Sequence, residues 1–220
     1  MALVLKFFVL SFSALLPVIN PLGSALIFLG VIGSAPPVKA RNLARRIAVA
    51  TTLFLGVIEL VGATLLHFFG ISLPVVQLAG GLVLAAMGWG LLQEKDSGDE
   101  EAAAQHAHDK GGSLEDKIFY PLTFPITAGP GCIVVILTLG AHASRNEVFH
   151  DVLAHLGITA AIVAISITVL LSYTYAPAIA QRIAPQTVRG ILRVIAFVLL
   201  CIGVQIAWNG LESMVKSMPK

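Results

Sequence analysis

Apolar stretches long enough to cross a lipid bilayer recur along the whole chain of 220 residues, with polar segments between them. A spanning helix needs roughly 20 consecutive apolar residues, because the hydrocarbon core of a bilayer is about 30 Å thick. The pattern therefore predicts an all-α membrane protein, and we expect the first apolar stretch to be a retained helix because no signal-peptide cleavage site follows it. The six predicted transmembrane helices are residues 3–33, 47–69, 72–92, 118–140, 152–176 and 190–211.

The composition agrees with this class. The chain is 57% hydrophobic and 12% charged, with a mean hydropathy of +0.89, whereas soluble domains usually carry about twice that share of charge. A net charge of +2 without a basic stripe argues against a nucleic-acid partner and leaves membrane lipid as the expected surroundings. Cys132 and Cys201 both fall in apolar stretches, so they indicate no disulfide framework.

One long polar connection divides the chain into two units. Residues 93–117 hold eight of the twelve acidic residues, and we expect them to form a cytoplasmic surface linker between a first repeat at residues 1–92 and a second at 118–220. His106 and His108 could hold a metal weakly, but a solvated loop is the stronger interpretation. We therefore predict no metal site.

The positions of lysine and arginine predict the orientation of the chain. The first, third and fifth connections between the predicted helices hold ten of these residues, and the opposite side holds four. Loops rich in lysine and arginine stay in the cytoplasm. We therefore expect a multi-pass protein of the inner (plasma) membrane with both termini on the extracytoplasmic side.

The two units resemble one another around a pair of interrupted helices. "LLPVINPLGSALIFLG" (15–30) and "TFPITAGPGCIVVILTLG" (123–140) each place a proline six residues before a glycine, and a weaker similarity links residues 84–92 with 199–207. Because each unit has an odd number of helices, the second would enter the membrane from the other side. Inverted repeats with matching interruptions mark the binding site of a transporter, near the middle of the membrane.

Both interruptions have the sequence of a helix that restarts. Proline clashes with the carbonyl four residues before it and excludes its predecessor from helical geometry. Asn20 before Pro21 therefore predicts an N-cap and first helical residue, and Gly129 before Pro130 predicts the same with a weaker cap. Such breaks survive in a membrane only against protein or a wet cavity. For a single proline, a packing kink is the more common explanation, but two matched breaks favour a functional site.

Two half-helix N-termini of this kind would suit an anion. We expect the N–H groups of Leu22 and Gly23, and of Gly131 and Cys132, to lack acceptors and to bind a carboxylate. The two glycines would allow the ligand to approach the backbone closely.

Other polar residues within the apolar stretches are weaker candidates. Glu59 could be a proton-coupling group or a protonated acid near the outer interface. Thr123 and Thr127 could bind substrate or only satisfy freed carbonyls, and Gln205 could bind substrate or pack between helices. Four small residues are expected at close helix contacts: Gly80, Gly81, Gly88 and Gly90.

The segments "INPLGSALIFLG", "FFGISLPVVQLAGGLVLAAMG", "YPLTFPITAGPGCIVVILTLG" and "RVIAFVLLCIGVQIAWNGLE" together resemble the MarC family of integral membrane proteins. The family is similar to the LysE-type exporters, and its SnatA-type members are described as transporters of small neutral amino acids such as glycine and alanine. The resemblance implies a central site at the matched positions. Ser24 stands where a more polar residue is expected, and Glu59 matches no motif position.

The sequence thus predicts a secondary transporter, an exporter or exchanger, for a small glycine- or alanine-like substrate, with no cofactor and no covalent chemistry. A passive channel and an accessory membrane protein without transport remain alternatives, and a homo-oligomer is compatible with the sequence. An enzyme is not expected, because no predicted helix contains a hydrolase or metalloprotease motif. The candidate substrate-binding residues are Asn20, Pro21, Gly23, Ser24, Thr123, Thr127, Gly129, Pro130, Gly131 and Gln205, with Glu59 as the candidate coupling group.

Overall fold

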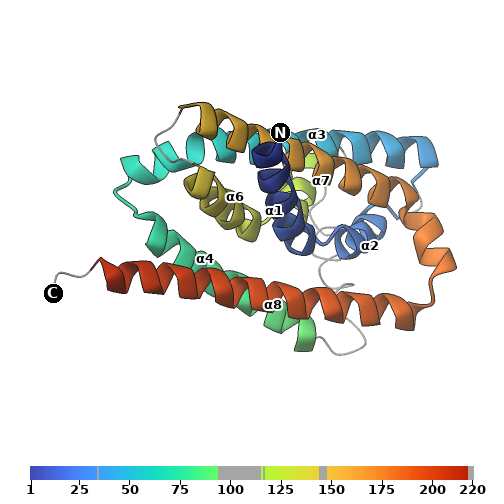
Figure 1. Ribbon diagram of the computed structural model, residues 1–220. Coiled ribbons are helices and arrows are strands. Elements are labelled where there is room, and N and C mark those ends of the chain that lie inside the picture. Colours follow the sequence, from blue (N-terminus) through green and yellow to red (C-terminus); the bar gives the residue numbers. More distant parts are fainter. Residues whose placement is uncertain (34, 94–114, 116, 144–147, 218–220) are drawn as a thin grey trace.

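The computed structural model describes residues 1–33, 35–93, 115, 117–143 and 148–217, and every regular element in this part of the chain is a helix (Figure 1). The predicted linker, with His106 and His108, lies outside these ranges except for residues 93, 115 and 117. The elements are α1 (Ala2–Ile19), α2 (Pro21–Ile32), α3 (Pro37–Phe68), α4 (Leu73–Gln93), η1 (Ile118–Thr127), α6 (Pro130–Ala143), α7 (Val148–Arg182) and α8 (Pro185–Lys216).

The prediction of a membrane protein with several spanning helices is confirmed. Five helices of the described chain (α1, α3, α4, α7 and α8) are long and apolar enough to cross a membrane, and η1 with α6 forms a sixth candidate bent by 64°. Three helices are longer than their predicted spans, because charged first or last turns continue the helix beyond the apolar stretch. In the first third of α3, for example, the exposed Arg46 forms a 3.6 Å ion pair with Glu115 near the end of the predicted linker.

Helix α7 packs against α1, α2 and α3, in the group of helices drawn in the upper part of Figure 1. Gly157 lets α1 approach α7 closely, since a Cβ atom there would lie 2.6 Å from the carbonyl oxygen of Val4. Further along α7, the ring of Tyr173 stacks on Phe28 of α2 with centroids 4.5 Å apart, and both side chains are buried. The two contacts show that α7 runs in the same direction as the path from α1 into α2.

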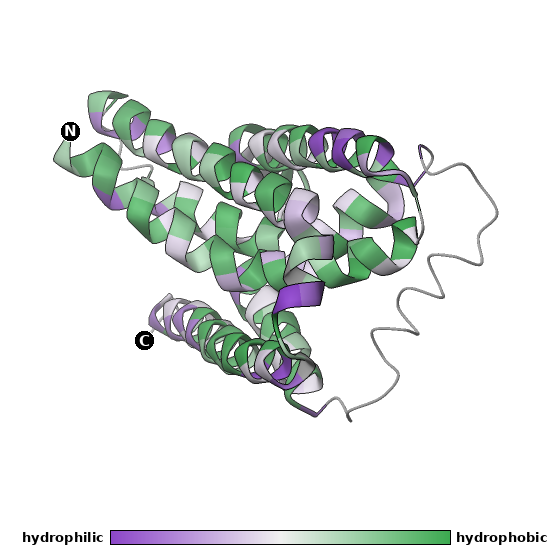
Figure 2. Cartoon of the chain, turned by 90° about the vertical axis from the view of Figure 1, so that its right-hand side faces the viewer, coloured by the Kyte–Doolittle hydropathy of each residue, from purple (hydrophilic) through white to green (hydrophobic). Residues whose placement is uncertain are grey.

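Helices α4 and α8 form a tight antiparallel pair below this group (Figures 1 and 2). Glycine allows the two backbones to touch: a Cβ atom at Gly81 would lie 2.3 Å from the backbone nitrogen of Ala207, and one at Gly203 would lie 2.3 Å from that of Ala85. The predicted close contacts at Gly80, Gly81 and Gly88 are confirmed. The prediction for Gly90 is wrong, since this residue faces open space.

The outer faces of the helices are largely apolar, as a lipid-facing surface requires (Figure 2). Leu53, Leu60, Phe197 and Trp208, for example, are each more than half exposed. In a soluble protein such a surface would cause aggregation. The apolar exterior and the buried polar residues described below give the protein an arrangement suited to a bilayer.

Candidate functional site

The first interruption forms as the sequence predicts. Asn20 ends α1 in a left-handed backbone conformation (φ 45°, ψ 67°), and Pro21 is the first residue of α2. The Asn20 side-chain oxygen accepts a hydrogen bond from the Gly23 N–H (3.2 Å), and its backbone carbonyl accepts from the N–H (2.9 Å) and the hydroxyl (3.0 Å) of Ser24. Asn20 therefore both stops one helix and caps the next.

The second interruption is longer, because the backbone of η1 is itself irregular: Tyr120 (φ −120°, ψ 123°) and Phe124 (φ −119°, ψ 128°) have extended rather than helical angles. In η1 the hydroxyls of Thr123 and Thr127 donate to the carbonyls of Ile118 (2.8 Å) and Leu122 (2.6 Å), five residues earlier in each case. Helix α6 then begins at Pro130. The threonines thus satisfy carbonyl groups that the irregular backbone frees, which was one of the two roles expected for them.

The two interruptions meet at one side chain of α7. The hydroxyl of Tyr173 lies 2.7 Å from the hydroxyl of Thr127, at the end of η1, and is close to the side chain of Ser24, in the first turn of α2. Ser24, Thr127 and Tyr173 are 4%, 1% and 1% exposed. We call these three residues the hydroxyl cluster. It brings together residues from before and after the polar connection of residues 93–117, near both helix starts.

The structure corrects the expected availability of the helix N–H groups. The Gly23 N–H is bonded to Asn20, and the Cys132 N–H is bonded to the carbonyl of Gly129 (3.0 Å). Leu22 and Gly131 are the second residues of their helices, where an N–H has no acceptor within the helix. The anion-binding capacity of the two helix starts is therefore smaller than the sequence indicated.

The glycines at the interruptions have a packing role. A Cβ atom at Gly23 would lie 2.4 Å from the amide nitrogen of Asn20, so glycine makes room for the cap. At Gly131 a Cβ atom would lie 2.3 Å from Leu84 of α4 and 3.0 Å from Val18 of α1. The start of α6 is thus packed against the end of α1. These contacts leave a ligand no open path to the backbone at Gly23 or at Gly131.

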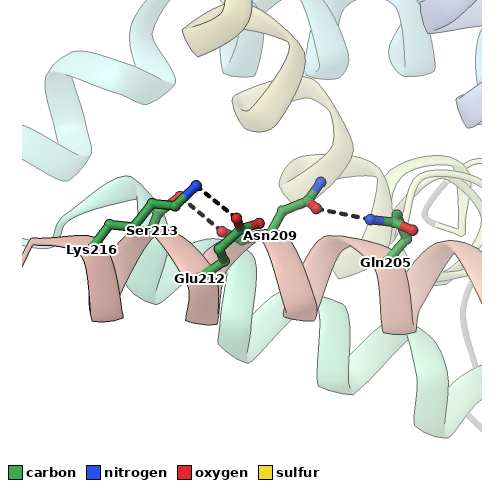
Figure 3. Close-up of polar contacts among 5 residues, drawn as sticks. All are labelled: Gln205, Asn209, Glu212, Ser213 and Lys216. Carbon is green, nitrogen blue, oxygen red and sulfur yellow. Dashed lines mark hydrogen bonds and ion pairs between the residues drawn. The ribbon is translucent and has the colours of Figure 1, made fainter.

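Gln205 is not part of the hydroxyl cluster. Its side-chain nitrogen donates to Asn209 on the same helix (2.8 Å), and both side chains project from one side of α8 (Figure 3). Further along α8, Lys216 and Glu212 form an ion pair of 2.6 Å, and the Ser213 hydroxyl donates to the Asn209 carbonyl (2.8 Å) (Figure 3). Asn209, Glu212, Ser213 and Lys216, but not Gln205, line a cleft of about 360 Å³ between α8, the start of α4 and the end of α6.

Glu59 is buried in α3 and its carboxylate contacts His155 of α7, with Oε1 2.5 Å from Nδ1. The pair lies apart from the hydroxyl cluster: His155 and Tyr173 are separated by about 27 Å along α7, at 1.5 Å of rise per residue. The sequence analysis did not predict the two partners on α7, which are Tyr173 for Thr127 and His155 for Glu59. A tyrosine and a histidine inside an apolar stretch were the available signals, since polar groups there need partners.

The fold and these buried polar contacts define a polytopic membrane protein with two interrupted helices that meet inside it. A sequence model described as "MarC family integral membrane protein" matches residues 5–215. The chain belongs to the MarC family.

Two relatives show the extent of the similarity. The inner membrane protein MarC of Escherichia coli (strain K12 / DH10B) is 29% identical over 210 residues, which cover 92% of this chain and 93% of the relative. The inner membrane protein MarC of Citrobacter koseri is 28% identical over 208 residues, with the same coverage. No solved structure matches the chain. The relatives' names agree with the multi-pass inner-membrane location expected from the sequence.

Proposed function

We propose that this protein is a secondary transporter, an exporter or exchanger, of small neutral amino acids or similarly small metabolites. One observation carries the proposal: the hydroxyl of Tyr173 lies 2.7 Å from that of Thr127, from the second interruption, and close to the side chain of Ser24, from the first. Hydroxyl groups and N–H groups at helix starts are suitable donors to the carboxylate of a zwitterion. Such a site lies between the two units whose relative movement would open it to either side.

The substrate carboxylate would lie against the starts of α2 and α6. The N–H groups of Leu22 and Gly131 are the donors available there. The hydroxyls of Ser24 and Thr127 donate to the carbonyls of Asn20 and Leu122 in this structure, so they would donate to the substrate in place of those bonds. Tight packing supports a small substrate, since even a Cβ atom at Gly23 or Gly131 would overlap a neighbouring side chain. The substrate would be recognised through its charges, and the proposal involves no covalent step.

An inverted repeat is part of this proposal, and the α4–α8 contacts support it. A Cβ atom at Gly81 would meet the Ala207 nitrogen and Gly203 oxygen, and one at Gly203 would meet the Ala85 nitrogen and Gly81 oxygen. At each glycine, an added Cβ atom would thus meet a backbone nitrogen and a backbone oxygen of the opposite helix.

A second pair of glycines behaves in the same way. Gly88 faces the backbone nitrogen of Leu200 and oxygen of Ala196, and Gly210 faces the nitrogen of Leu78 and oxygen of Pro74. The same number of sequence positions separates Gly81 from Gly203 and Gly88 from Gly210, as a two-fold axis between the helices requires. This separation differs from the offset of the weaker similarity between residues 84–92 and 199–207.

The test is solute exchange in proteoliposomes that contain the purified protein and unlabelled glycine. We expect labelled glycine and alanine to enter faster than into protein-free liposomes, and Thr127→Val to reduce this exchange. Thr168→Val is the matched control, because the Thr168 hydroxyl also donates to a backbone carbonyl (Ala164, 3.0 Å), but this bond stays within α7 and does not involve either helix break. A wild-type protein that exchanges neither amino acid would contradict the proposal.

A further inference from the structure

A second buried polar site lies between α3 and α7, away from the hydroxyl cluster. The side chain of Glu59 is 1% exposed, and its Oε1 is bonded to Nδ1 of His155, whose side chain is 33% exposed. The other carboxylate oxygen, Oε2, is buried and has no hydrogen-bond partner in the part of the chain that the structure describes. A carboxyl group in the apolar part of a spanning helix is costly, so such groups mark ion or proton pathways more often than packing contacts.

The polar surroundings of the pair are concentrated on α7. His150 and Asp151, 3.7 Å apart, lie about one turn nearer the start of this helix than His155, and each is about a quarter exposed. Asp151 and His155 occupy the same face, because residues four apart are neighbours on a helix. Polar side chains therefore lead from the beginning of α7 to the buried carboxylate.

The other elements packed against α3 are α6 and η1. Their titratable side chains, with that of the residue before η1, are Cys132, His142, Tyr120 and Lys117. His142 is exposed and its Nδ1 is bonded to the Thr138 carbonyl. Lys117 is buried two positions after Glu115, which pairs with Arg46 in the first third of α3. The Glu59 carboxylate is hydrogen-bonded to His155.

We propose that the Glu59–His155 pair is a proton-binding site that couples proton movement to solute transport. This inference rests on the proposed transport function and names its coupling ion. With a neutral imidazole and an ionised carboxylate the pair carries one negative charge, and one added proton makes it neutral. A dry apolar environment disfavours the charged form. The pair therefore takes up a proton when α3 and α7 close around it and releases the proton when water reaches it.

The position of the pair between the two units makes this exchange sensitive to conformation. Glu59 belongs to the first unit and His155 to the second, so a relative movement of the units changes the contact. Helix α7 also carries Tyr173 of the hydroxyl cluster. A shift of α7 as a rigid element would thus alter both sites together, without direct contact between them.

Proton coupling is tested by uptake into proteoliposomes with and without an imposed pH gradient. We expect the gradient to stimulate glycine or alanine uptake by the wild-type protein, and Glu59→Gln and His155→Gln to abolish this stimulation while exchange at equal pH continues. Glu115→Gln is the control, because Glu115 is an exposed acid in a surface ion pair. Equal stimulation in wild type and Glu59→Gln would overturn the inference and leave the transport proposal standing.

A second measurement does not depend on transport. Infrared difference spectra recorded across a pH titration should show a protonated-carboxyl band in the wild-type protein that is lost in Glu59→Gln and shifted in His155→Gln. If the wild type and Glu59→Gln give the same spectra, Glu59 does not bind the proton. If the band behaves as expected but no amino acid is exchanged, the proton site stands and the transport proposal fails.

Discussion

The hydroxyl groups of Thr127 and Tyr173 lie 2.7 Å apart, although the residues are 46 positions apart in the sequence and belong to η1 and α7. Tyr173 is held in place by its stacking on Phe28, so its hydroxyl has a fixed position at the interruption. The side chain of Ser24, from the other interruption, is close to the same group. Tyr173 thus connects the two features that the sequence marks as functional.

The first prediction concerns this hydroxyl. Tyr173→Phe keeps the ring and its stacking but removes the hydrogen bond to Thr127, so glycine exchange should fall about twofold to tenfold, since such a bond contributes about 0.5–1.5 kcal/mol. Tyr175→Phe is the control, because Tyr175 is exposed on the same helix. The double variant with Thr127→Val should lose less than the sum of the two single effects, because both remove the same bond. Fully additive losses would show that the two hydroxyls act separately.

The second prediction separates the two roles of Asn20. Asn20→Ala removes a cap, at a cost of about 1 kcal/mol, and also places alanine in a left-handed conformation that costs roughly 1–2 kcal/mol. Asn20→Gly loses the cap but accepts the conformation freely. Thermal unfolding in detergent should therefore rank wild type above Asn20→Gly, and Asn20→Gly above Asn20→Ala. Equal stability of the two variants would mean that the backbone is not strained at this position.

The third prediction tests the contact between α4 and α8. Gly81→Ala would place a methyl group against the backbone of Ala207, so the helices must separate, at a cost of about 1–3 kcal/mol. Gly90→Ala is the matched control on the same helix, since nothing lies within 4 Å of its added Cβ atom. A lower thermal midpoint should follow only for Gly81→Ala. The pairing of α4 with α8 would be in doubt if both variants were equally stable.

The fourth prediction tests the expected orientation. Ser72 and Gln181 are exposed at opposite ends of the helices, and the lysine and arginine distribution places Ser72 outside and Gln181 in the cytoplasm. In a background without Cys132 and Cys201, an impermeant thiol reagent added to intact cells should label Ser72→Cys but not Gln181→Cys. The reverse pattern would show that the orientation is inverted.

The helix breaks could be predicted from the sequence because their causes are local. Asn20 with Pro21, and Gly129 with Pro130, determine where one helix stops and the next begins, and the structure has both breaks at these residues. The spans were predictable for the same reason, although their polar ends were not. At Gly23 local reasoning failed: the absence of a side chain suggested access for a ligand, whereas the space is filled by Asn20.

The partners of the buried polar groups could not be predicted, because they depend on how distant helices pack. Glu59 and His155 are 96 positions apart, and neither has a local pattern that names the other. Gln205 shows the same difficulty in reverse: it was predicted as a possible ligand for substrate, but its partner is Asn209, one turn further along its own helix. A single sequence indicates which polar residues need partners but not which partners they find.

The central claim is that the hydroxyl cluster, between the two helix breaks, binds the carboxylate of the substrate. The most direct measurement is the rate at which a thiol reagent labels Ser24→Cys in the background without Cys132 and Cys201, with either glycine or glycinamide present. Glycinamide has the same size and amino group but no carboxylate. We predict that glycine slows the labelling and that glycinamide does not. Equal protection by both compounds, or protection by neither, would contradict the claim.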